Sequence, residues 1–441
     1  MTNLKLSPTI RQTGPKSFHF SESQILNNAE NKVRKTAFDV LNKTTLPDTS
    51  VEAWRRTDLK SFPIDLFKIF TTLDEIALPQ IPKEILEPMV DDKFGGQIIT
   101  TPFSTTIALD EDIKNSGVIF TDIKTAETKY PDQLKKILGT LVNPEESIFA
   151  ALSASLAQTG VFIYVPKNVK VEKPLHSIFW AGGNGLAFIS NILVYLEENA
   201  SLTFVHESAS PKESEDQILS SNNIEINLSK GAQLRFVELQ SWGKNVWNFS
   251  HERSRVEEGA NLDWIIGSLG SRLTKNFSDI DLVGVGATGR MSGFYITDNN
   301  QHIDHDTQQN HFAGKTTSDL LFKGALLDHS RSVWQGMIYV APDAQQSDGY
   351  QANRNLILSE HARADSIPGL EILADDVRCT HGATVGKLEA EPIFYLKSRG
   401  IPQAEAEKLV VEGFFDPIMQ RIPFQGVRDR FKEAIINKMT K

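Results

Sequence analysis

Apolar residues divide the chain into a helical start, a long strand-rich middle and a helical end. Near the start, apolar residues at helical spacing follow residues 21–24, whose Ser-Glu-Ser-Gln order suits a capping box. These apolar positions are Ile25, Leu26, Ala29, Val33, Ala37, Val40 and Leu41. A second helix is predicted from Asn143, because Asn caps helices, Pro144 suits the first helical position and acidic residues follow. We expect that helix to run to about Gln158, so residues 1–158 are predicted to form a mainly helical N-terminal domain with a few strands.

Short β-rich runs separated by small turns replace the helical spacing from Val161 to about Leu388. A weak repeat marks these turns, with a small residue before an apolar one at intervals of 27 to 38 residues. The marker alanines are Ala200, Ala232, Ala260, Ala287 and Ala325. Irregular repeats of this length favour the coils of a β-solenoid, with a β-sandwich as the alternative. The pattern places a β-helical core domain at residues 159–386.

The last part of the chain returns to helical spacing. Residues 403–414 form a short segment with one apolar face after Pro402. In the final stretch Val427, Phe431, Ile435 and Met439 recur every four residues. Such a stripe is more often core than partner surface. Residues 387–441 are therefore predicted to form a C-terminal helical domain that caps the solenoid or docks another protein.

Composition narrows the classes of partner. The chain has 441 residues with 46 basic and 56 acidic side chains, a net charge of −10 that disfavours binding to nucleic acid or to an anionic membrane. The start of the sequence lacks the apolar core of a signal peptide, and no run of about 18 apolar residues occurs. A cytoplasmic location is therefore expected. Cys379 is the only cysteine, so this sequence cannot supply an internal disulfide or a site of four thiolates.

Two apparent motifs are more simply explained as structure. Residues 284–289 match G-x-G-x-x-G, but the following residues 290–296 are strand-like, whereas a dinucleotide site needs a helix there. His302, His305 and His311 lie near Asp304 and Asp306, and imidazoles with carboxylates can bind zinc or iron. Their spacing matches no familiar ligand pattern. On a strand His302 and His305 point to opposite faces, which favours a polar segment with hydrogen-bonded histidines.

The most informative residues are Cys379 and His381. One residue separates them, so on a strand both side chains share a face, with Cβ atoms roughly 6.6 Å apart. They could converge on one metal atom, or form a nucleophilic pair in which the imidazole lowers the thiol pKa. A buried thiol beside a hydrogen-bonded histidine is the simpler alternative. No third orienting residue or oxyanion hole can be named for a hydrolase.

The segment around these residues resembles the signature of the SufB/SufD family of the SUF iron–sulfur cluster assembly system. It covers residues 370–386, and residues 394–401 and 350–356 resemble the helix that follows and the strand that precedes it in the family. Residues 52–59 and 117–122 are also similar to family segments, so the resemblance spans most of the chain. The length, the Trp-Arg-Arg-Thr-Asp order at residues 54–58 and the near absence of cysteine resemble the SufD branch.

The resemblance implies a right-handed parallel β-helix between helical N-terminal and C-terminal domains. It implies a non-enzymatic scaffold that pairs with a SufB-like subunit through the β-helix and docks a SufC-like ATPase through the C-terminal domain. His381 matches the histidine implicated at the subunit interface, where it helps to hold iron or a nascent iron–sulfur cluster shared with SufB. Cys379 matches the accompanying cysteine. The sequence contains no G-x-x-x-x-G-K-[ST] loop, which agrees with ATP hydrolysis by a partner.

Three questions stay open at this point. A β-helix enzyme acting on carbohydrate is one alternative, although residues 375–378 hold the only obvious charged cluster, Asp375, Asp376 and Arg378. A purely structural partner of SufB, with His381 incidental, is another. The sequence also does not decide whether the chain forms a homodimer when its partners are absent.

Overall fold

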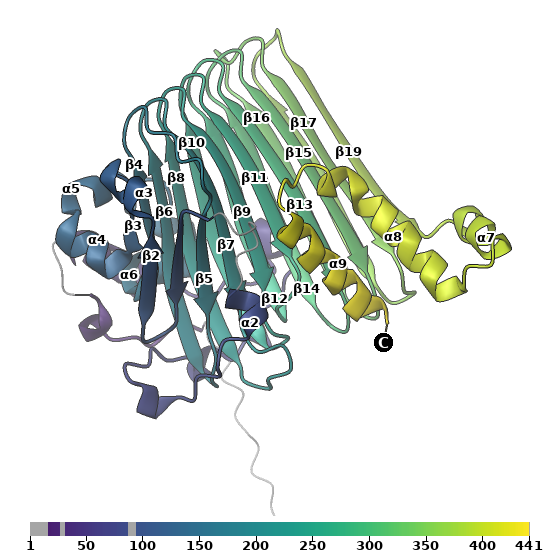
Figure 1. Cartoon of the computed structure of the whole chain (residues 1–441), viewed down its shortest axis with the longest axis horizontal. Helices are drawn as coiled ribbons and strands as arrows, with labels where there is room; N and C mark the ends of the chain where they lie inside the picture. The colour runs from purple at the N-terminus through teal and green to yellow at the C-terminus, as the bar shows by residue number, and fades with distance from the viewer. Residues whose placement is uncertain (1–15, 27–30, 87–93, 441) are drawn as a thin grey trace, which may run out of the picture.

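The computed structural model describes residues 16–26, 31–86 and 94–440, and its centre is a parallel β-solenoid (Figure 1). Within these residues the strands form two facing sheets, and the chain passes from one sheet to the other in every turn. Sheet I has ten strands in the order β19-β17-β15-β13-β11-β9-β7-β5-β1-β2, and sheet II has nine in the order β18-β16-β14-β12-β10-β8-β6-β4-β3. The predicted mainly β fold with a parallel β-helix core is confirmed.

Strands of each sheet pair in parallel, except that β2 and β3 pair antiparallel with β1 and β4. Sheet I contains β1(Gly96–Thr100), β2(Thr105–Leu109), β5(Leu175–Trp180), β7(Ser201–Ala209), β9(Gln233–Ser241), β11(Asn261–Ser268), β13(Thr288–Thr297), β15(Thr317–Leu326), β17(Asp348–Ile357) and β19(Arg378–Lys387). Sheet II contains β3(Ile119–Asp122), β4(Thr159–Val165), β6(Leu186–Leu196), β8(Ile218–Leu228), β10(Val246–Val256), β12(Leu273–Leu282), β14(His302–His311), β16(Arg331–Val340) and β18(Arg363–Ile372). Strands from before residue 159 thus extend both sheets at the first end of the solenoid.

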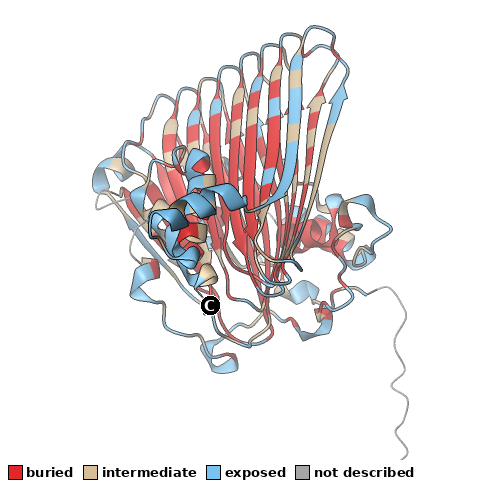
Figure 2. Ribbon diagram, turned by 90° about the vertical axis from the view of Figure 1, so that its right-hand side faces the viewer, coloured by how far each residue is buried: buried red, intermediate tan, exposed pale blue. Residues whose placement is uncertain are grey.

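The interior between the sheets is filled by side chains that stack from turn to turn. Phe204, Phe236 and Trp264 occupy equivalent positions of β7, β9 and β11, with ring centroids 5.2 Å and 5.8 Å apart. Alternate residues of a strand face the same side, so a fixed register from turn to turn keeps these rings in one column. Figure 2 shows the middle strands as buried, with intermediate and exposed residues becoming common in the last strands.

The repeated corner between sheet II and sheet I explains the spacing of small residues. Asn199, Gly231, Gly259 and Gly286 have a φ between 55° and 73°, and each precedes a buried alanine. This left-handed conformation is easy for glycine and tolerable for asparagine. The fifth marker was wrong, because Ala325 lies inside β15. The equivalent corner has Lys315 at a φ of 58° followed by buried Thr316.

The helices of the N-terminal region are η1(Glu22–Gln24), α1(Asn31–Lys43), η2(Glu52–Trp54), η3(Ile64–Leu66), η4(Leu73–Glu75), α2(Lys83–Leu86), α3(Glu111–Asn115), α4(Ile123–Lys129), α5(Pro131–Leu134), η5(Pro144–Glu146) and α6(Ile148–Leu156). Helices α1 and α6 pack on the outer side of sheet II, whereas α2 packs beside β5 of sheet I. Helix α6 is buried along its whole length between α1 and strands β6, β8 and β10. Phe149 stacks on Phe249 of β10 with ring centroids 3.7 Å apart, so aromatic packing holds this region on the solenoid.

Both predicted helix starts form a capping box, which was expected only at Ser21, but each box caps a single 3-10 turn. Ser21 and Gln24 close the box of η1, and the chain is extended again at Ile25, so α1 begins later, at Asn31. The predicted helical residue Ala29 lies outside the described residues. Asn143 and Glu146 close the box of η5, and Ser147 then caps α6 afresh. A capping box satisfies local N–H groups, and it does not set the length of the helix that it starts.

The C-terminal helices α7(Ala390–Ser398), α8(Gln403–Met419) and α9(Gln425–Met439) lie on the side of sheet I (Figure 1). Helix α8 contacts β13 and β15 and helix α9 contacts β13, whereas α7 packs on α8 and extends away from the solenoid. Val427, Phe431 and Ile435 are buried against the outer face of sheet I, so the predicted stripe is core. Among the helices that the structure describes, none is both long and apolar enough to cross a bilayer.

Candidate functional site

Cys379 and His381 lie on β19, the terminal strand of sheet I. Within the described residues β19 pairs with β17 alone, and its other edge is unpaired. Cys379 stands opposite Gly349 and His381 opposite Gln351. The two residues are therefore at the open end of the solenoid, at the end opposite to β2 and β3.

Both side chains are on the interior face of β19. A Cβ placed on Gly349 would lie 3.2 Å from both Cys379 Sγ and Ile338 Cγ2, so the thiol shares a small apolar cluster with Ile338. Gln351 is fully buried, and its amide donates to the carbonyl of Gly369 at 2.8 Å. His381, two residues after Cys379, faces the same side as its neighbour Gln351. Because β19 is the last strand of its sheet, His381 is solvent-exposed at the mouth of the interior.

The environment of Cys379 keeps its thiol protonated. Partial burial raises the pKa of Cys379, the backbone N–H of Gly349 opposes this effect, and Asp348 adds to the increase. A nucleophilic cysteine needs a lowered pKa, so this geometry does not match a Cys–His nucleophile. A soft metal could still displace the proton, because thiolate is the form that binds metals.

The histidines of β14 are separated by the alternation of the strand, as predicted. On the outer face, Thr57 Oγ1 lies 2.9 Å from His302 Nε2, and on the interior face Ser268 Oγ lies 3.1 Å from His305 Nε2. His311 is bound by the hydroxyls of Thr316 and Ser318, at 2.7 Å and 2.8 Å. Within the described part of the chain, no three histidine, cysteine, aspartate or glutamate side chains are grouped for metal binding.

Residues 284–289 and a groove on sheet I both have structural roles. Residues 284–289 form a corner that leads into β13, which is the strand expected there. A groove on the outer face of sheet I, with a volume of about 530 Å³, contains Asp263 between Arg235 and Arg290. Burial raises the pKa of Asp263, but hydrogen bonds from Arg290 and Arg235 outweigh it and leave the pKa below its usual value. This carboxylate is fixed in its ionised form.

Two models of known protein families match most of this chain. Residues 179–414, which include Cys379 and His381, match the family described as "SUF system FeS cluster assembly, SufBD core domain". Residues 18–176 match the "SufBD protein N-terminal region". The chain belongs to the SufBD family.

Curated members of the SufBD family align over most of this chain. The iron–sulfur cluster assembly protein SufB of Bacillus subtilis is 29% identical over 358 residues, which are 81% of this chain and 75% of that protein. A SufBD family protein of Staphylococcus saprophyticus is 28% identical over the same shares of the two chains. These relatives place the chain in iron–sulfur cluster assembly, and they do not separate a SufD role from a SufB role.

Sequence reasoning missed a buried ionic contact that fixes the N-terminal region of this SufBD-family chain. Lys275 Nζ of β12 lies 2.9 Å from Asp304 Oδ1 of β14, and both side chains are almost fully buried. The hydroxyl of Thr57 donates to the second oxygen of Asp304, and Lys275 also lies over the rings of Trp54 and Phe277. Residues 54–57 belong to the Trp-Arg-Arg-Thr segment that resembles the family. That resemblance was the signal in the sequence that could have pointed to this contact.

Proposed function

We propose that this chain is a SufD-type scaffold subunit of a SUF iron–sulfur cluster assembly complex. In this role it pairs with a SufB-like subunit through the open end of the β-solenoid and docks a SufC-like ATPase through its C-terminal helices. It catalyses no reaction itself and works in the cytoplasm. The observation that carries the proposal is the position of His381 and Cys379 on the interior face of β19, the terminal strand of sheet I, which pairs on one edge only within the described residues.

The ligand chemistry of the two residues supports a shared site. A cluster is bound mainly by cysteine thiolates, and histidine can replace cysteine on some irons. This chain has one cysteine, so it can contribute only part of a ligand set. An iron or a nascent cluster would therefore be cargo held between His381 and residues of a SufB-like subunit, with Cys379 as a second contributor after loss of its proton.

The open end has the surface character of a pairing face. Strands β18 and β19 leave large apolar side chains in solvent, including Val385 at 48% and Ile372 at 38% exposure. An unpaired edge beside exposed apolar groups is a favourable site for another chain. A SufB-like subunit covering this end would bring its own ligands to His381. A second copy of this chain could use the same face when the partner is absent.

The C-terminal helices support docking of an ATPase. Phe394 and Tyr395 of α7 are 74% and 56% exposed, although α8 and α9 bury their own apolar stripe against sheet I. Helix α7 is held on α8 and extends from the solenoid in Figure 1. Exposed aromatic side chains on a rigid support are typical anchors of protein interfaces. Movement of such a docked subunit could be passed along α8 to β15.

The SufD assignment rests on the sequence features of that branch and on the single cysteine, since a main cluster scaffold needs more thiolates. The purely structural role stays the second candidate, because His381 could be incidental to pairing. A carbohydrate-active enzyme is less favoured. The groove on sheet I fixes Asp263 as an ion between two arginines, whereas a glycosidase needs one carboxyl group that is protonated to act as an acid.

Copurification tests the proposed role directly. The chain is produced together with SufB-like and SufC-like proteins and purified anaerobically at low salt, and a ternary complex is the expected result. Failure to form any such complex would refute the assignment. His381→Ala should then lower cluster loading on the complex, measured by Mössbauer spectroscopy, whereas Thr380→Ala on the opposite face is the matched control. Normal loading with His381→Ala would instead support the purely structural role.

A further inference from the structure

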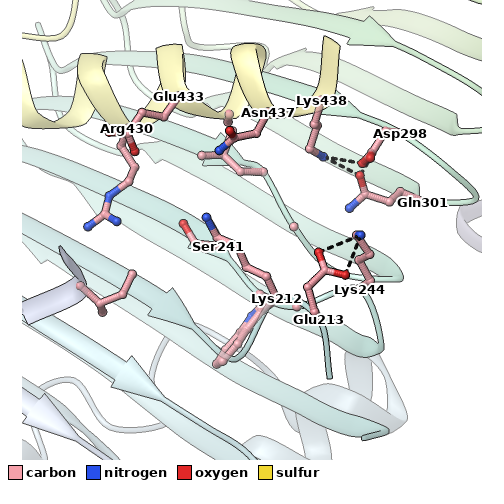
Figure 3. A pocket seen from close by; sticks show the side chains of 16 residues that line it. Lys212, Glu213, Ser241, Lys244, Asp298, Gln301, Arg430, Glu433, Asn437 and Lys438 are labelled. Atoms are coloured by element: carbon pink, nitrogen blue, oxygen red, sulfur yellow. Dashed lines mark hydrogen bonds and ion pairs between the residues drawn. The ribbon is translucent and has the colours of Figure 1, made fainter. Parts of the chain in front are cut away.

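A recess lies under α9, on the corner of the solenoid where sheet I passes into sheet II. Its volume is about 160 Å³, and Figure 3 shows α9 above it and the strands and loops of the solenoid below. The recess is lined by α9 and by loops of four successive turns, those between β7 and β8, β9 and β10, β11 and β12, and β13 and β14. It is separate in the fold from β19 and its histidine.

The recess has an apolar part. Ile85 of α2, Trp242, Leu269 and Ala434 of α9 all contribute to its wall. Trp242 is held in place because its indole N–H donates to Asn248 Oδ1 at 3.1 Å. Two glycines, Gly243 and Gly270, keep the loops thin at this point, and an added Cβ at either would meet backbone atoms of a neighbouring turn. The wall is therefore built from fixed groups.

Cations concentrate around this apolar wall. Lys244 is paired with Glu213 at 3.1 Å, and Lys438 is paired with Asp298 at the same distance and bound to Gln301 at 2.6 Å (Figure 3). Burial, with the charges of Lys244 and Lys212, lowers the pKa of Lys438 to about 7. Lys438 is thus buried near two other cations, and Glu433 is exposed on the α9 side.

A second recess adjoins the first and continues this cationic character. Its volume is about 300 Å³, and the two recesses share Lys244 and Gln301. Its remaining lining residues are Asn245, Arg272, Asn299 and Asn300, so it contains two cations, four amide side chains and no carboxylate. The guanidinium of Arg272 lies over the ring of Trp247, 4.9 Å from its centroid, which keeps the cation near this wall. Lysine, arginine and amide groups together are suitable donors for a carboxylate or phosphate.

We propose that the two recesses form one binding site for a small organic oxyanion. The carboxylate or phosphate group lies at Lys244 and Arg272, and the apolar body lies under α9 against Trp242 and Leu269. Because α9 forms one wall, an occupied site holds the end of α9 more firmly on the solenoid. This inference concerns the isolated chain and is independent of the proposed role in cluster assembly.

Phenyl phosphate is a suitable probe, since it joins an oxyanion to an apolar ring. Titration of the full chain, followed by calorimetry, should show saturable binding to one site per chain, at least about tenfold tighter than binding of inorganic phosphate. Hydrogen exchange should slow in α9 when the probe is bound. Absence of saturable binding, equal affinity for inorganic phosphate, or protection confined to β18 and β19 would each overturn the proposal.

Two variants test the two halves of the site separately. Arg272→Gln removes a cation and Ala434→Leu fills the recess from α9, and each should weaken phenyl phosphate at least about tenfold. The controls are Lys230→Gln, at the opposite corner of the solenoid, and Ala404→Leu, at an exposed position of α8. Thermal unfolding confirms that each variant is folded. Unchanged affinity in both folded test variants would contradict the site.

Discussion

The hydroxyl of Ser147 lies 2.9 Å from Nε2 of His251, and this contact joins the start of α6 to strand β10. Ser147 Oγ already accepts hydrogen bonds from the backbone N–H groups of Phe149 and Ala150, at 3.2 Å and 3.1 Å. Its own proton is therefore available to His251, which must be neutral at Nε2 to accept it. The cap of the most deeply buried helix thus depends on an uncharged imidazole.

Acid should weaken this contact. Burial, followed by the charges of Arg253 and Lys275, lowers the pKa of His251 from 6.5 to about 3. The folded state therefore binds fewer protons than the unfolded chain below pH 6.5, and stability falls as the pH falls from 6.5 toward 3. The contribution of one such histidine is about 1.4 kcal/mol per pH unit. His251→Gln, which can still accept from Ser147, should remove that part of the slope.

Denaturant unfolding at several pH values between 5 and 7 measures this effect, with the same replacement at the exposed His19 as the control. Other buried histidines and carboxyl groups titrate in the wild type and in both variants, so they cancel in the comparison. Parallel pH profiles for the wild type and His251→Gln would show that the Ser147 cap does not depend on the imidazole charge.

The buried pair Lys275–Asp304 predicts a large stability effect from a single replacement. Lys275→Met leaves the carboxylate of Asp304 buried without its cation, which typically costs about 3–5 kcal/mol. The double replacement Lys275→Met with Asp304→Leu should cost less, because the fully buried carboxylate is then removed and only Asp306, which lies 3.9 Å from Lys275 and is partly exposed, loses a cation. Chemical unfolding measures both. Lys230→Met, which breaks an exposed pair with Glu258, is the control and should change the stability little, because solvent screens that pair.

Release of the N-terminal segment provides a second readout of the same pair. Thr57 donates to Asp304, and Trp54 lies beside Lys275, so loss of the lysine should loosen residues 52–58 on sheet II. Faster hydrogen exchange in that segment is expected, with no change in β18 and β19. Equal free energies of unfolding for Lys275→Met and the wild type would mean that the pair makes no net contribution to stability.

Two glycines of sheet I predict a contrast, because Gly293 is on the interior face of β13 whereas Gly382 is on the outer face of the terminal strand β19. Gly293 of β13 stands opposite Phe322 of β15, and an added Cβ would lie 2.1 Å from the phenyl ring. Gly293→Ala should therefore destabilise the chain by about 1–3 kcal/mol through overpacking. Gly382 of β19 has no atom within 4 Å of an added Cβ, so Gly382→Ala should be close to neutral. Thermal and denaturant unfolding compare the two, and equal losses would contradict this account of the interior.

The local sequence pattern predicted the solenoid, but it did not predict the lengths of the helices before it. The Gly-Ala and Asn-Ala corners were readable because a left-handed residue before a buried alanine recurs at four successive corners, from Asn199 to Gly286. That signal disappears at Lys315 and Thr316, where neither residue is small, and the repeat pattern pointed to Ala325 instead. The capping box at Ser21 was also readable, yet it is satisfied by one turn of 3-10 helix.

Only part of the geometry of the candidate site could be predicted from the local sequence. Strand alternation placed Cys379 and His381 on one face, but only the register with Gly349 and Gln351 shows that this face is the interior. The contact of Thr57 with Asp304 joins residues 247 positions apart. No local spacing contains that information, because it depends on which strand lies beneath the N-terminal segment.

One replacement at the open end should weaken binding of the partner without unfolding the chain. Val385 of β19 shares the interior face with His381 and is half exposed, whereas Thr384 points to the opposite side. Val385→Lys places a charge on the proposed pairing face, so binding to a SufB-like subunit should weaken by about tenfold or more. The free energy of unfolding of the isolated chain should change by less than about 0.5 kcal/mol, as for other surface positions.

Titration of the labelled chain with a SufB-like subunit measures the pairing, and Thr384→Lys is the matched control for added charge. The control should keep wild-type affinity if the interior mouth is the contact. Equal weakening by both lysines would indicate a general effect of charge on β19. Unchanged affinity with Val385→Lys would move the pairing face away from the open end and would separate His381 from any shared cluster.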